Sequence, residues 1–578
     1  MTWLEKANEW LQYDNLDIHV KRGLVEAFKD YKELEDAFYC NCEFGTAGMR
    51  GELGPGTNRM NIYTVRKAAK GLSLYMESQG AEAKRRGVVI AYDCRHMSKE
   101  FALEMAKTLG QHRIKVYLFS ELRPTPELSF AVRYLNSFAG IMITASHNPS
   151  IYNGLKIYGE DGCQLTPEAA ECIVENMDTI ENELYIEVAN ENDLLQDGLL
   201  TYIDEEIDSA YLVQLKKLQL NINMPHDVKI VYSPLHGTGG KSVVAGLKAF
   251  GFNHVTVVKE QMIPDPEFST VKSPNPEEHE AFTMAIEYGK QVDADVLLAT
   301  DPDADRLGVA VKNSLGEYVV LTGNQLGALL VNYILSQKLE KNILPENGVI
   351  IKSIVTSSLG EMIASHYGVP TLNTLTGFKY IGEKIGQFEE NNQYSFLMGY
   401  EESYGYLMSD FVRDKDGVQA ALITAEMVAY YKNKGQCLYE TMKILFEQFG
   451  YYKEAIQSLT MKGKEGAAQI NDIMSEFRSS SPNEIAGLKV LYLEDYHSSQ
   501  RIDLSRKHVE DIHLPKSNVL KFYCENDAWF CLRPSGTEPK IKIYFGVKGQ
   551  TEEESQTILE QLQEEVMKRV NQQTPVLV

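Results

Sequence analysis

The sequence Ile143-Thr144-Ala145-Ser146-His147-Asn148-Pro149 decides how the rest of the chain is interpreted. The apolar run 139–143 that leads into it predicts a short buried strand, and Asn148-Pro149 is typical of a turn. Ser146 therefore follows the carboxyl end of a strand, which is where open α/β sheets bind their ligands. A basic residue, Lys156, follows in Tyr152-Asn153-Gly154-Leu155-Lys156. The competing interpretation is an ordinary capped turn whose serine has no chemical role.

The composition restricts the class of protein. With 578 residues, 44% of them hydrophobic and 24% charged, the chain is typical of a soluble globular protein with several domains. Its formal net charge of −24 predicts an acidic surface that repels nucleic acid and anionic lipid. We therefore expect neither nucleic acid nor a membrane as a partner, and any site for an anionic ligand must be locally basic.

Cysteine usage and the absence of targeting signals favour the cytoplasm. The cysteines are scattered, with no Cys-x-x-Cys motif, which predicts reduced thiols and no zinc site. The N-terminal sequence Met1-Thr2-Trp3-Leu4-Glu5-Lys6 lacks the apolar core of a signal peptide. No uninterrupted apolar run approaches the roughly 20 residues of a membrane span. We expect a cytoplasmic protein, and nothing in the sequence indicates its oligomeric state.

A second predicted strand, 295–300, ends in a cluster of carboxylates, Asp301-Pro302-Asp303-Ala304-Asp305-Arg306. Three unpaired carboxylates on one short loop repel each other and raise their pKa values, and a hard divalent cation removes that repulsion. An EF-hand is excluded because Arg306 and Lys312 occupy its sixth and twelfth positions. The aspartyl phosphatase motif Asp-x-Asp-x-Thr does not match, because Asp305 replaces the threonine. A solvated acidic turn is the remaining alternative.

Three further motifs contain the residue types of a ligand-binding loop. The glycines of Glu43-Phe44-Gly45-Thr46-Ala47-Gly48-Met49-Arg50-Gly51 permit close approach of the backbone to a ligand, and Arg50 can bind a phosphate bidentately. Two acids and a serine end another predicted strand, in Gly399-Tyr400-Glu401-Glu402-Ser403, where they can bind hydroxyl groups. Arg533-Pro534-Ser535-Gly536-Thr537 combines a guanidinium, hydroxyls and a glycine in a candidate anion site. Taken singly, each motif is also explained by an exposed turn.

Taken together and in this order, the motifs resemble those of the α-D-phosphohexomutases, the phosphoglucomutase/phosphomannomutase family, and most closely its bacterial phosphoglucomutases. The residues 144–156 resemble the family's phosphoserine loop, and 301–306 its magnesium-binding loop. The residues 399–403 resemble the sugar-recognition loop, and 533–539 the phosphate-binding loop. The residues 44–51 resemble the entry motif Phe-Gly-Thr-x-Gly-x-Arg-Gly. The resemblance extends over nearly the whole chain.

The resemblance implies an α/β fold with three similar mixed-sheet α/β domains and a smaller C-terminal α+β domain around a central cleft. We expect an N-terminal helical extension at 1–40, with about two amphipathic helices. The four domains are then placed at 41–205, 206–320, 321–450 and 451–578, carrying in turn the phosphoserine, metal-binding, sugar-binding and phosphate-binding loops. From the residues alone, alternating strands and helices in the first domain predict a mostly parallel sheet. Three motifs at expected strand–helix turns indicate a weak internal repeat.

The resemblance also implies the chemistry. Ser146 carries a phosphoryl group, and Mg²⁺ is bound by Ser146, Asp301, Asp303 and Asp305. Phosphoryl transfer interconverts glucose 1-phosphate and glucose 6-phosphate through glucose 1,6-bisphosphate, which is also the expected activator. Lys156 is the candidate base, which requires its pKa to fall toward neutrality, and His147 is the competing candidate. The residues expected to bind the sugar phosphate are Arg50, Arg306, Thr376, Gly377, Lys379, Glu401, Ser403, Lys415, Arg533, Ser535, Gly536 and Thr537.

Three other functions are alternatives. A mutase of the same family acting on mannose or pentose phosphates is the first, because Tyr400 departs from the family's sugar-recognition loop. A serine hydrolase or phosphatase is the second, and the absence of Gly-x-Ser-x-Gly around Ser146 counts against the hydrolase. A non-catalytic sugar-phosphate sensor is the third, and the presence of Ser146, Lys156 and all three aspartates counts against it.

Overall fold

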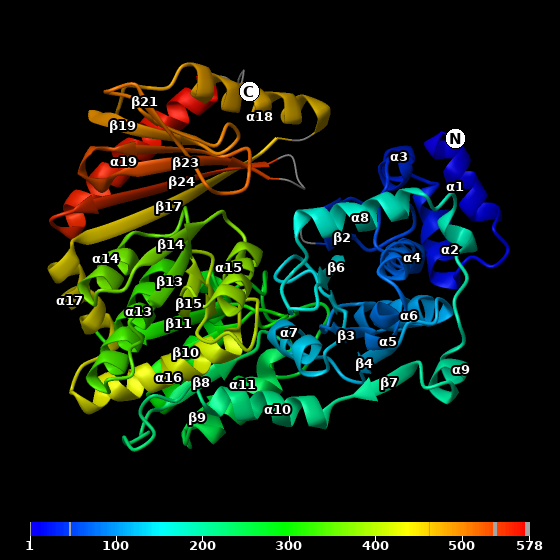
Figure 1. The fold of residues 1–578 in the computed structure, drawn as a ribbon, viewed down its shortest axis with the longest axis horizontal. Helices are drawn as coiled ribbons and strands as arrows, with labels where there is room; N and C mark the ends of the chain where they lie inside the picture. Colours follow the sequence, from blue (N-terminus) through cyan, green and yellow to red (C-terminus); the bar gives the residue numbers. More distant parts are fainter. Residues whose placement is uncertain (1, 46–47, 462, 536–539, 573–578) are drawn as a thin grey trace.

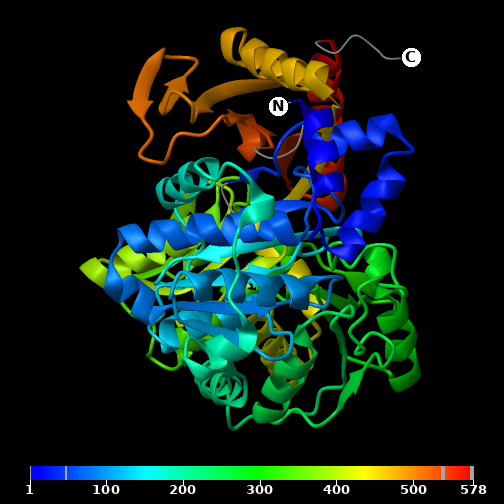
Figure 2. The same ribbon diagram turned by 90° about the vertical axis from the view of Figure 1, so that its right-hand side faces the viewer.

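The computed structural model describes residues 2–45, 48–461, 463–535 and 540–572 of the chain. Three α/β units, coloured blue to yellow in Figure 1, are followed by a C-terminal unit in orange and red, which lies above the third. Figure 2 shows the same arrangement turned by 90°; the N-terminal helices and the C-terminal unit overlap in that view but lie on opposite sides of the molecule in Figure 1. This architecture confirms the expected class of fold.

The N-terminal extension contains three short helices rather than the expected two, and they are α1 (Trp3–Gln12), α2 (Ile18–Ala27) and α3 (Tyr31–Phe38). Each begins at a side-chain cap, which Thr2, Asp17 and Asp30 provide. Trp10 is fully buried, and its ring meets Phe38 edge-on at 5.4 Å between centroids. The Trp10 ring also lies 5.2 Å from that of Tyr63 in domain I, and this contact packs the extension against domain I.

Domain I is built on a mixed sheet of order β1-β2-β6-β5-β3-β4-β7. Its strands are β1 (Phe44–Gly45), β2 (Gly48–Glu52), β3 (Val88–Tyr92), β4 (Val116–Phe119), β5 (Ala139–Ile143), β6 (Tyr152–Tyr158) and β7 (Leu200–Ile203). Its helices are α4 (Ile62–Ser78), α5 (Ala81–Arg86), α6 (Ser98–Gln111), α7 (Thr125–Tyr134), α8 (Pro167–Asp178), η1 (Glu183–Tyr185) and α9 (Glu191–Gln196), and α10 (Glu205–Lys216) comes next in the chain.

Strand β3 shows why helices cover both faces of this sheet. Val88 and Ile90 belong to a core that includes α4 and α6, whereas Val89 and Ala91 belong to a second core that includes α7. Successive side chains of a strand point to opposite faces, so a continuous apolar run is buried on both sides. The sheet is not mostly parallel as expected, because β6, β2 and β1 pair in antiparallel fashion beyond β5.

Domains II and III repeat this plan with smaller sheets, of orders β12-β11-β10-β8-β9 and β14-β13-β15-β16. The elements of domain II are β8 (Ile230–Ser233), α11 (Gly239–Ala249), β9 (Val255–Val257), η2 (His279–Phe282), α12 (Thr283–Val292), β10 (Val296–Thr300), β11 (Leu307–Lys312) and β12 (Tyr318–Val320). Those of domain III are α13 (Gly323–Glu340), β13 (Gly348–Ser353), α14 (Leu359–His366), β14 (Thr371–Thr374), α15 (Phe378–Asn391), β15 (Ser395–Glu401), β16 (Gly405–Leu407), α16 (Gly417–Asn433) and α17 (Leu438–Phe449).

The internal repeat differs from the expected one in the element that follows each loop, which is a strand and not a helix. The serine loop joins β5 to β6, the aspartate loop joins β10 to β11, and the 402–404 loop joins β15 to β16. In all three cases the second strand pairs antiparallel with the first. Each loop is therefore the tip of a hairpin and not a strand–helix turn. The apolar strands β6, β11 and β16 each pair with the strand before them in their own sheet. The turn residues alone do not predict this pairing.

Helix α16 joins domains II and III. Most of its residues from Gly417 to Tyr431 are buried, and a helix that is apolar on all sides belongs inside a core. It contacts α11 and β10 of domain II and α13 of domain III. The two domains therefore share one core instead of meeting at a polar surface.

Domain IV is a two-layer unit with an eight-stranded sheet of order β17-β24-β23-β22-β19-β20-β21, with β18 paired to β19. Its strands are β17 (Tyr451–Thr460), β18 (Glu484–Ile485), β19 (Leu488–Asp495), β20 (Gln500–Asp503), β21 (His508–Asp511), β22 (Leu520–Cys524), β23 (Trp529–Pro534) and β24 (Lys540–Gly549). Its helices are α18 (Gly463–Ser479), η3 (Glu525–Asp527) and α19 (Glu552–Gln572). Among the described residues, no helix combines the length and apolar character needed to cross a bilayer.

Candidate active site

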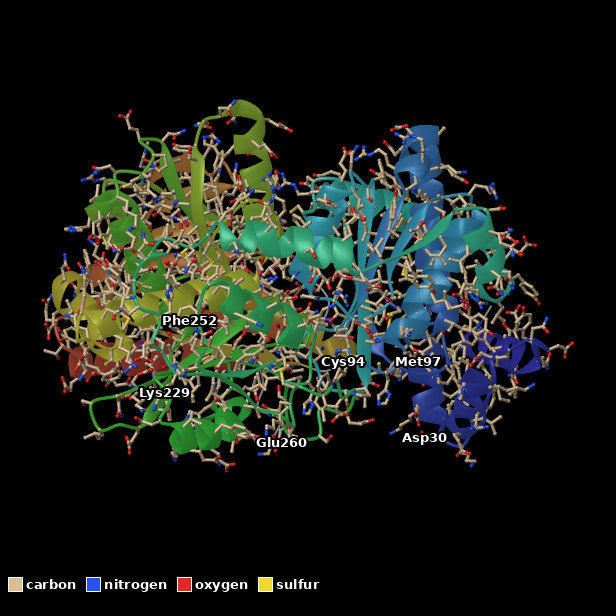
Figure 3. The ribbon with its side chains drawn as sticks, turned by 90° about the horizontal axis from the view of Figure 1, so that it is seen from below. Asp30, Cys94, Met97, Lys229, Phe252 and Glu260 are labelled. Carbon is tan, nitrogen blue, oxygen red and sulfur yellow. The ribbon has the colours of Figure 1, made fainter. Side chains whose placement is uncertain are left out.

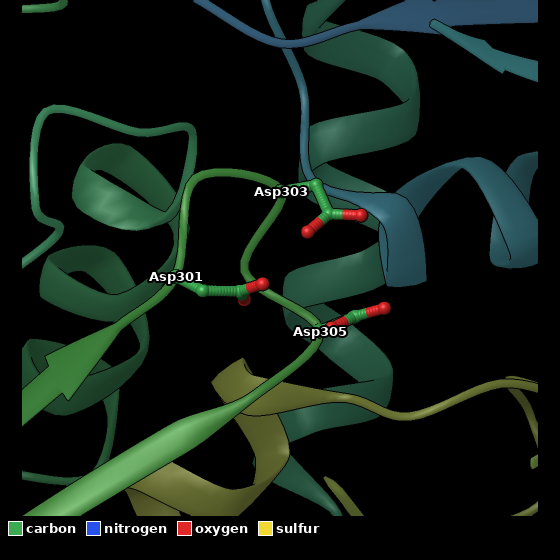
Figure 4. Close-up of side chains that lie close together, drawn as sticks. All are labelled: Asp301, Asp303 and Asp305. Atoms are coloured by element: carbon green, nitrogen blue, oxygen red, sulfur yellow. The ribbon is translucent and has the colours of Figure 1, made fainter. Parts of the chain in front are cut away.

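The three aspartates converge at the tip of the β10–β11 hairpin (Figure 4). One carboxylate oxygen from each of Asp301, Asp303 and Asp305 lies within 4.8 Å of the others, and all three residues are buried. Burial, and then the charges of Asp303 and Asp305, raise the pKa of Asp301 well above its usual value. Among the described residues, Oδ1 of Asp303 and Oδ1 of Asp305 are buried without a hydrogen-bond partner. This set of hard oxygen donors fits a divalent cation.

Domain I also forms hydrogen bonds with the aspartate loop, through the first residue of α7. Thr125, the first residue of α7, donates from its backbone N to Asp303 O at 2.9 Å and from its hydroxyl to Asp303 Oδ2 at 2.9 Å. Within the loop, the backbone N of Arg306 donates to Asp301 Oδ1 at 3.0 Å. These bonds orient the carboxylates without using the two unpaired oxygens.

Ser146 lies directly against this loop. It is 5% exposed, and its Oγ donates to Asp301 Oδ2 at 2.7 Å. Its backbone is left-handed, with φ of 51°, a conformation that costs a non-glycine residue free energy. The structure thus brings together the serine and the carboxylate cluster that sequence reasoning singled out separately.

His147 lies beside the serine hydroxyl, with Nδ1 at 3.2 Å from Ser146 Oγ. Burial, and then the positive charges of Arg306 and Arg50, lower the pKa of His147 well below its usual value. The imidazole is therefore neutral at physiological pH and able to accept a proton in the cleft.

Lys156 projects from β6 into the aspartates, and its Nζ donates to Asp303 Oδ2 at 2.7 Å and to Asp305 Oδ2 at 3.2 Å. Burial lowers the pKa of Lys156, but the two carboxylates outweigh burial and raise it above its usual value. The expected fall toward neutrality is therefore absent in this arrangement, because the sequence did not show which acids face the amine.

Arg306 joins the 399–403 segment to the aspartate loop, and Lys415 joins the neighbouring segment around Asp414 to the same loop. Arg306 Nη1 donates to Ser403 O at 3.0 Å and also pairs with Glu277. Lys415 Nζ lies 3.1 Å from Asp305 Oδ2 and 3.1 Å from Asp414 Oδ1. Domains II and III therefore present these side chains to the cleft as one rigid unit.

Glu401 ends β15 with its carboxylate buried in the cleft wall. Burial, and then the charge of Glu402, raise the pKa of Glu401 to about 7. Its Oε1 accepts a hydrogen bond from Gly377 N at 2.7 Å, which ties it to the Thr376-Gly377 turn. The hydroxyl of Thr376 is buried and has no hydrogen-bond partner among the described residues.

Tyr400, the residue that put the sugar specificity in doubt, faces away from the cleft. It is fully buried in the core of domain III. A Cβ atom added to Gly360 would lie 2.0 Å from the Tyr400 hydroxyl, and one added to Gly327 would lie 2.4 Å from its ring. Tyr400 therefore fills space between two helices, and it does not contact a ligand directly.

The 533–539 motif begins at the end of β23, and its first residue, Arg533, lines the cleft. Arg533 Nη1 donates to the Tyr544 hydroxyl at 3.4 Å, and Ser535 N donates to Lys540 O at 2.7 Å. Gly536 and Thr537 lie outside the described residues. From domain I, Arg50 reaches toward the same cleft, with Nη1 at 3.2 Å from Asn148 Oδ1.

One cleft of about 690 Å³ collects most of the predicted site residues. Its lining includes Arg50, Ser146, His147, Lys156, Asp305, Arg306, Thr376, Gly377, Glu401, Ser403, Lys415 and Arg533. Lys379 is not among its lining residues and instead lines a separate pocket of about 350 Å³ between domains I and III. Among the described residues that line the cleft, six are cations (Arg50, Lys156, Arg306, Lys415, Arg533 and Lys542) and five are carboxylates (Glu277, Asp305, Glu401, Glu402 and Glu454). The cleft is therefore near charge balance and less acidic than the protein as a whole, which has a net charge of −24.

Sequence reasoning missed several residues of the cleft wall, among them Glu277, Asn324, Glu454, Lys542 and Tyr544. Lys542 stands directly opposite Arg533 in the antiparallel β23–β24 pair. Continuing the hairpin register past the 533–539 motif would have found it. Glu277 lies in the same domain as Arg306, with which it pairs, but 29 positions away in the chain, and Glu454 lies in domain IV against residues of domain III. No local signal marks either residue.

Comparisons with known proteins agree with this geometry. Four domain models described as phosphoglucomutase/phosphomannomutase match the chain, namely alpha/beta/alpha domain I over 41–184, domain II over 209–316, domain III over 322–449 and the C-terminal domain over 460–568. A phosphoglucomutase from Staphylococcus epidermidis is 42% identical, over 93% of this chain and 96% of its own length.

Solved structures share the fold at lower identity. The exocytosis-sensitive phosphoprotein pp63/parafusin of Paramecium, a phosphoglucomutase in its open form, has a TM-score of 0.68 at 18% identity and covers 92% of this chain and 95% of its own. N-acetylphosphoglucosamine mutase of Aspergillus fumigatus, in complex with GlcNAc-6P and magnesium, has a TM-score of 0.51 at 13% identity and covers 97% and 100%. With four matching domain models in order and a 42% identical relative over nearly its full length, the chain belongs to the phosphoglucomutase/phosphomannomutase family.

Proposed function

We propose that the protein is a phosphoglucomutase, which interconverts glucose 1-phosphate and glucose 6-phosphate through a phosphorylated Ser146. The observation that carries this proposal is the contact of Ser146 Oγ with Asp301 Oδ2 at 2.7 Å, where Ser146 lines a cleft of about 690 Å³ that also presents six cationic side chains. The glucose assignment is supported by the staphylococcal relative, which is named phosphoglucomutase.

In the proposed reaction, the phosphorylated Ser146 donates its phosphoryl group to the free hydroxyl of the sugar monophosphate. The bond from phosphorus to Ser146 Oγ breaks, a bond from phosphorus to the sugar oxygen forms, and the hydroxyl proton passes to a base in the cleft. After the bisphosphate turns over, its other phosphoryl group returns to Ser146 Oγ, and the proton returns to the sugar oxygen. Such transfers depend on positioning and charge stabilisation more than on covalent assistance.

The chain's own residues supply that positioning. Arg533, with Ser535, Gly536 and Thr537, holds the phosphate that is not being transferred. Glu401 and Ser403 accept and donate hydrogen bonds to the sugar hydroxyls, and Arg306 keeps Ser403 in place through its backbone carbonyl. Lys156 and His147 are the two candidates for the base, and both line the cleft beside Ser146.

Mg²⁺ is the proposed cofactor, held by Asp301, Asp303, Asp305 and an oxygen of Ser146. When bound, it would supply positive charge to stabilise the phosphorylated serine. The all-oxygen, buried donor set supports a hard cation, and the A. fumigatus mutase of the same fold is described with magnesium. Glucose 1,6-bisphosphate is the proposed activator, because it can phosphorylate Ser146 again. The free state of all cysteines supports a cytoplasmic location.

A mutase assay tests the function. Purified protein with Mg²⁺ and a trace of glucose 1,6-bisphosphate should convert glucose 1-phosphate faster than mannose 1-phosphate or ribose 1-phosphate. Faster turnover of mannose or ribose 1-phosphate would reassign the enzyme to another member of the family. No turnover of any of the three, by protein shown to be phosphorylated on Ser146, would contradict the proposal.

A further inference from the structure

Arg95 lies beneath the serine loop, outside the cleft, and holds its backbone. It is 3% exposed, and its two terminal nitrogens donate to the carbonyl oxygens of residues 146, 148, 149 and 152 at 2.5–3.0 Å. A buried carbonyl without a donor costs free energy, so four carbonyls that converge on one guanidinium are best satisfied in this one loop conformation. Only arginine has donors spread widely enough in a plane to reach all four.

Asp93 connects Arg95 to the serine through a second route. Its carboxylate is fully buried, and Oδ2 lies 3.3 Å from Arg95 Nε and accepts the Thr144 hydroxyl at 2.7 Å. Thr144 Oγ1 in turn accepts the backbone N–H of Ser146 at 2.8 Å. The backbone N and the backbone O of Ser146 are therefore both held, directly or through Thr144, by the Arg95–Asp93 pair.

The backbone held in this way is strained. Ser146 has φ of 51°, and two other non-glycine residues around Arg95 are also left-handed, Met97 at 66° and Phe268 at 51°. Such conformations persist only where the surroundings over-determine them, and they concentrate at functional sites. We call Arg95, Asp93 and Thr144 together the clamp. Without it, the left-handed Ser146 backbone that directs Oγ to Asp301 would lose the hydrogen bonds made by its N and O.

Domain II covers the other side of the same guanidinium. The Arg95 guanidinium carbon lies 4.9 Å from the centroid of the Phe268 ring, and Phe268 is 2% exposed. Beside it, His96 Nε2 lies 2.6 Å from Glu267 Oε1. Figure 3 labels Cys94 and Met97, the chain neighbours of Arg95 and His96. The clamp therefore contacts the domain that carries the aspartates.

We propose that Arg95 is a positioning residue for phosphoryl transfer: it holds loop 146–152 so that Ser146 Oγ meets Asp301, and Phe268 of domain II holds Arg95. Only the kinetic test of this inference rests on the proposed function. Arg95 does not line the cleft, so it acts through the serine backbone and not on the sugar phosphate. Its loss should therefore reduce the rate of transfer more than the binding of substrate.

The test compares Arg95→Gln and Arg95→Lys with the wild type and with Arg85→Gln, which alters an exposed arginine paired with Glu82. Arg95→Gln should lower kcat on glucose 1-phosphate by about 10²-fold with little change in KM, because displacements near 1 Å have that effect. Arg95→Lys should have a kcat between those of Arg95→Gln and the wild type, since an ammonium keeps the positive charge but not the planar set of guanidinium donors. Phe268→Leu should give a smaller loss of kcat, and Arg85→Gln none.

Hydrogen exchange provides a readout that does not need activity. In Arg95→Gln, amides of the segment 144–152 should exchange faster, while those of β3 keep their protection. Wild-type kcat and wild-type exchange in Arg95→Gln would overturn the proposal, as would a rise in KM with unchanged kcat. If Arg95→Gln does not fold, Arg95→Lys decides by the same measurements. If the wild type shows no mutase turnover, the proposed function fails, and exchange in 144–152 alone decides on the clamp.

Discussion

Ser146 Oγ and Asp301 Oδ2 are joined by a hydrogen bond of 2.7 Å although 155 positions separate the two residues in the chain. The serine stands at the tip of the β5–β6 hairpin of domain I, and the aspartate at the tip of the β10–β11 hairpin of domain II. This contact places a phosphorylatable hydroxyl on a buried carboxylate cluster. A phosphoryl group there, with about −2 in charge, requires the surrounding cations.

The first prediction is that active enzyme carries one phosphoryl group on Ser146. Dephosphorylated protein should be nearly inactive on glucose 1-phosphate, and a trace of glucose 1,6-bisphosphate should restore turnover. Ser146→Ala should lose both phosphorylation and turnover without unfolding, since a loop serine contributes little to a core. Intact-mass analysis with peptide mapping, run beside the assay, checks this. Rapid turnover by Ser146→Ala would refute the phosphoserine mechanism.

The second prediction concerns the metal ligands. Asp303→Asn should lower Mg²⁺ affinity by more than about 100-fold, because even an outer partner of a ligand is worth 10–100-fold. Turnover should depend on added Mg²⁺ and stop in a chelator. Metal analysis after dialysis and a Mg²⁺ titration of activity are the measurements. Asp197→Asn, at an exposed position paired with Arg113, is the matched control. Full activity in a chelator by metal-free protein would disprove the assignment.

The third prediction separates Lys156 from His147. Lys156→Met should leave the enzyme folded and phosphorylated but slow it by about 10²–10⁴-fold, the usual effect of a lost general acid or base. His147→Ala should slow it less. Single-turnover transfer from phosphorylated enzyme to glucose 1-phosphate measures the step directly. The reverse order of effects would transfer the role of base to His147, whose lowered pKa already keeps the ring neutral.

The fourth prediction concerns sugar recognition. For glucose 1-phosphate, Glu401→Gln should lower kcat/KM by about 10- to 100-fold, the cost of a lost hydrogen bond to a charged group, and Ser403→Ala by about 2- to 10-fold, the cost of one between neutral groups. Both variants should still accept a phosphoryl group on Ser146 from the bisphosphate, because neither residue touches the serine. Phosphorylation stoichiometry and steady-state kinetics distinguish the two effects. Loss of phosphorylation in either variant would show that the sugar loop has another role.

The fifth prediction is a pH dependence of stability due to Glu426, far from the metal loop. It is buried in α16, where it accepts Leu220 N at 3.1 Å, and burial raises its pKa from 4.5 to about 7. Between these values the unfolded chain releases the proton that the folded chain retains, so stability falls as pH rises. The loss amounts to about 3 kcal/mol between pH 5 and 8.

Denaturant unfolding at several pH values checks this effect. In Glu426→Gln, whose side chain does not titrate, the decline of unfolding free energy from pH 5 to 8 should be smaller than in the wild type. Glu390→Gln, at an exposed position of α15, should follow the wild type. An unchanged pH slope in Glu426→Gln would show that the carboxyl is already ionised in the folded protein at pH 5.

Local signals in the sequence were enough to predict an α/β first domain and the strand ends that carry function, and the family resemblance supplied the rest of the fold. The apolar runs before Ser146 and Asp301 form buried strands, and the glycines, prolines and aspartates after them form turns. These signals are strong because strand and turn propensities depend on residues within a few positions of each other. The prediction of a helix after each turn was wrong, since completion of a sheet by β6, β11 and β16 depends on a partner strand.

Tertiary packing alone decided which charged groups face each other. Lys156 meets Asp303 across 147 positions of the chain, and this pairing raises the lysine pKa instead of lowering it. Lys379 lines a separate pocket instead of the cleft, and Tyr400 is buried in the core of domain III instead of facing a ligand. Arg95 reaches four carbonyls 51 to 57 positions away. The sequence by itself determined the chemistry of each loop, because that chemistry resides in adjacent residues. The position and protonation of each group were decided by packing between domains, because Coulomb and burial energies depend on distances in space.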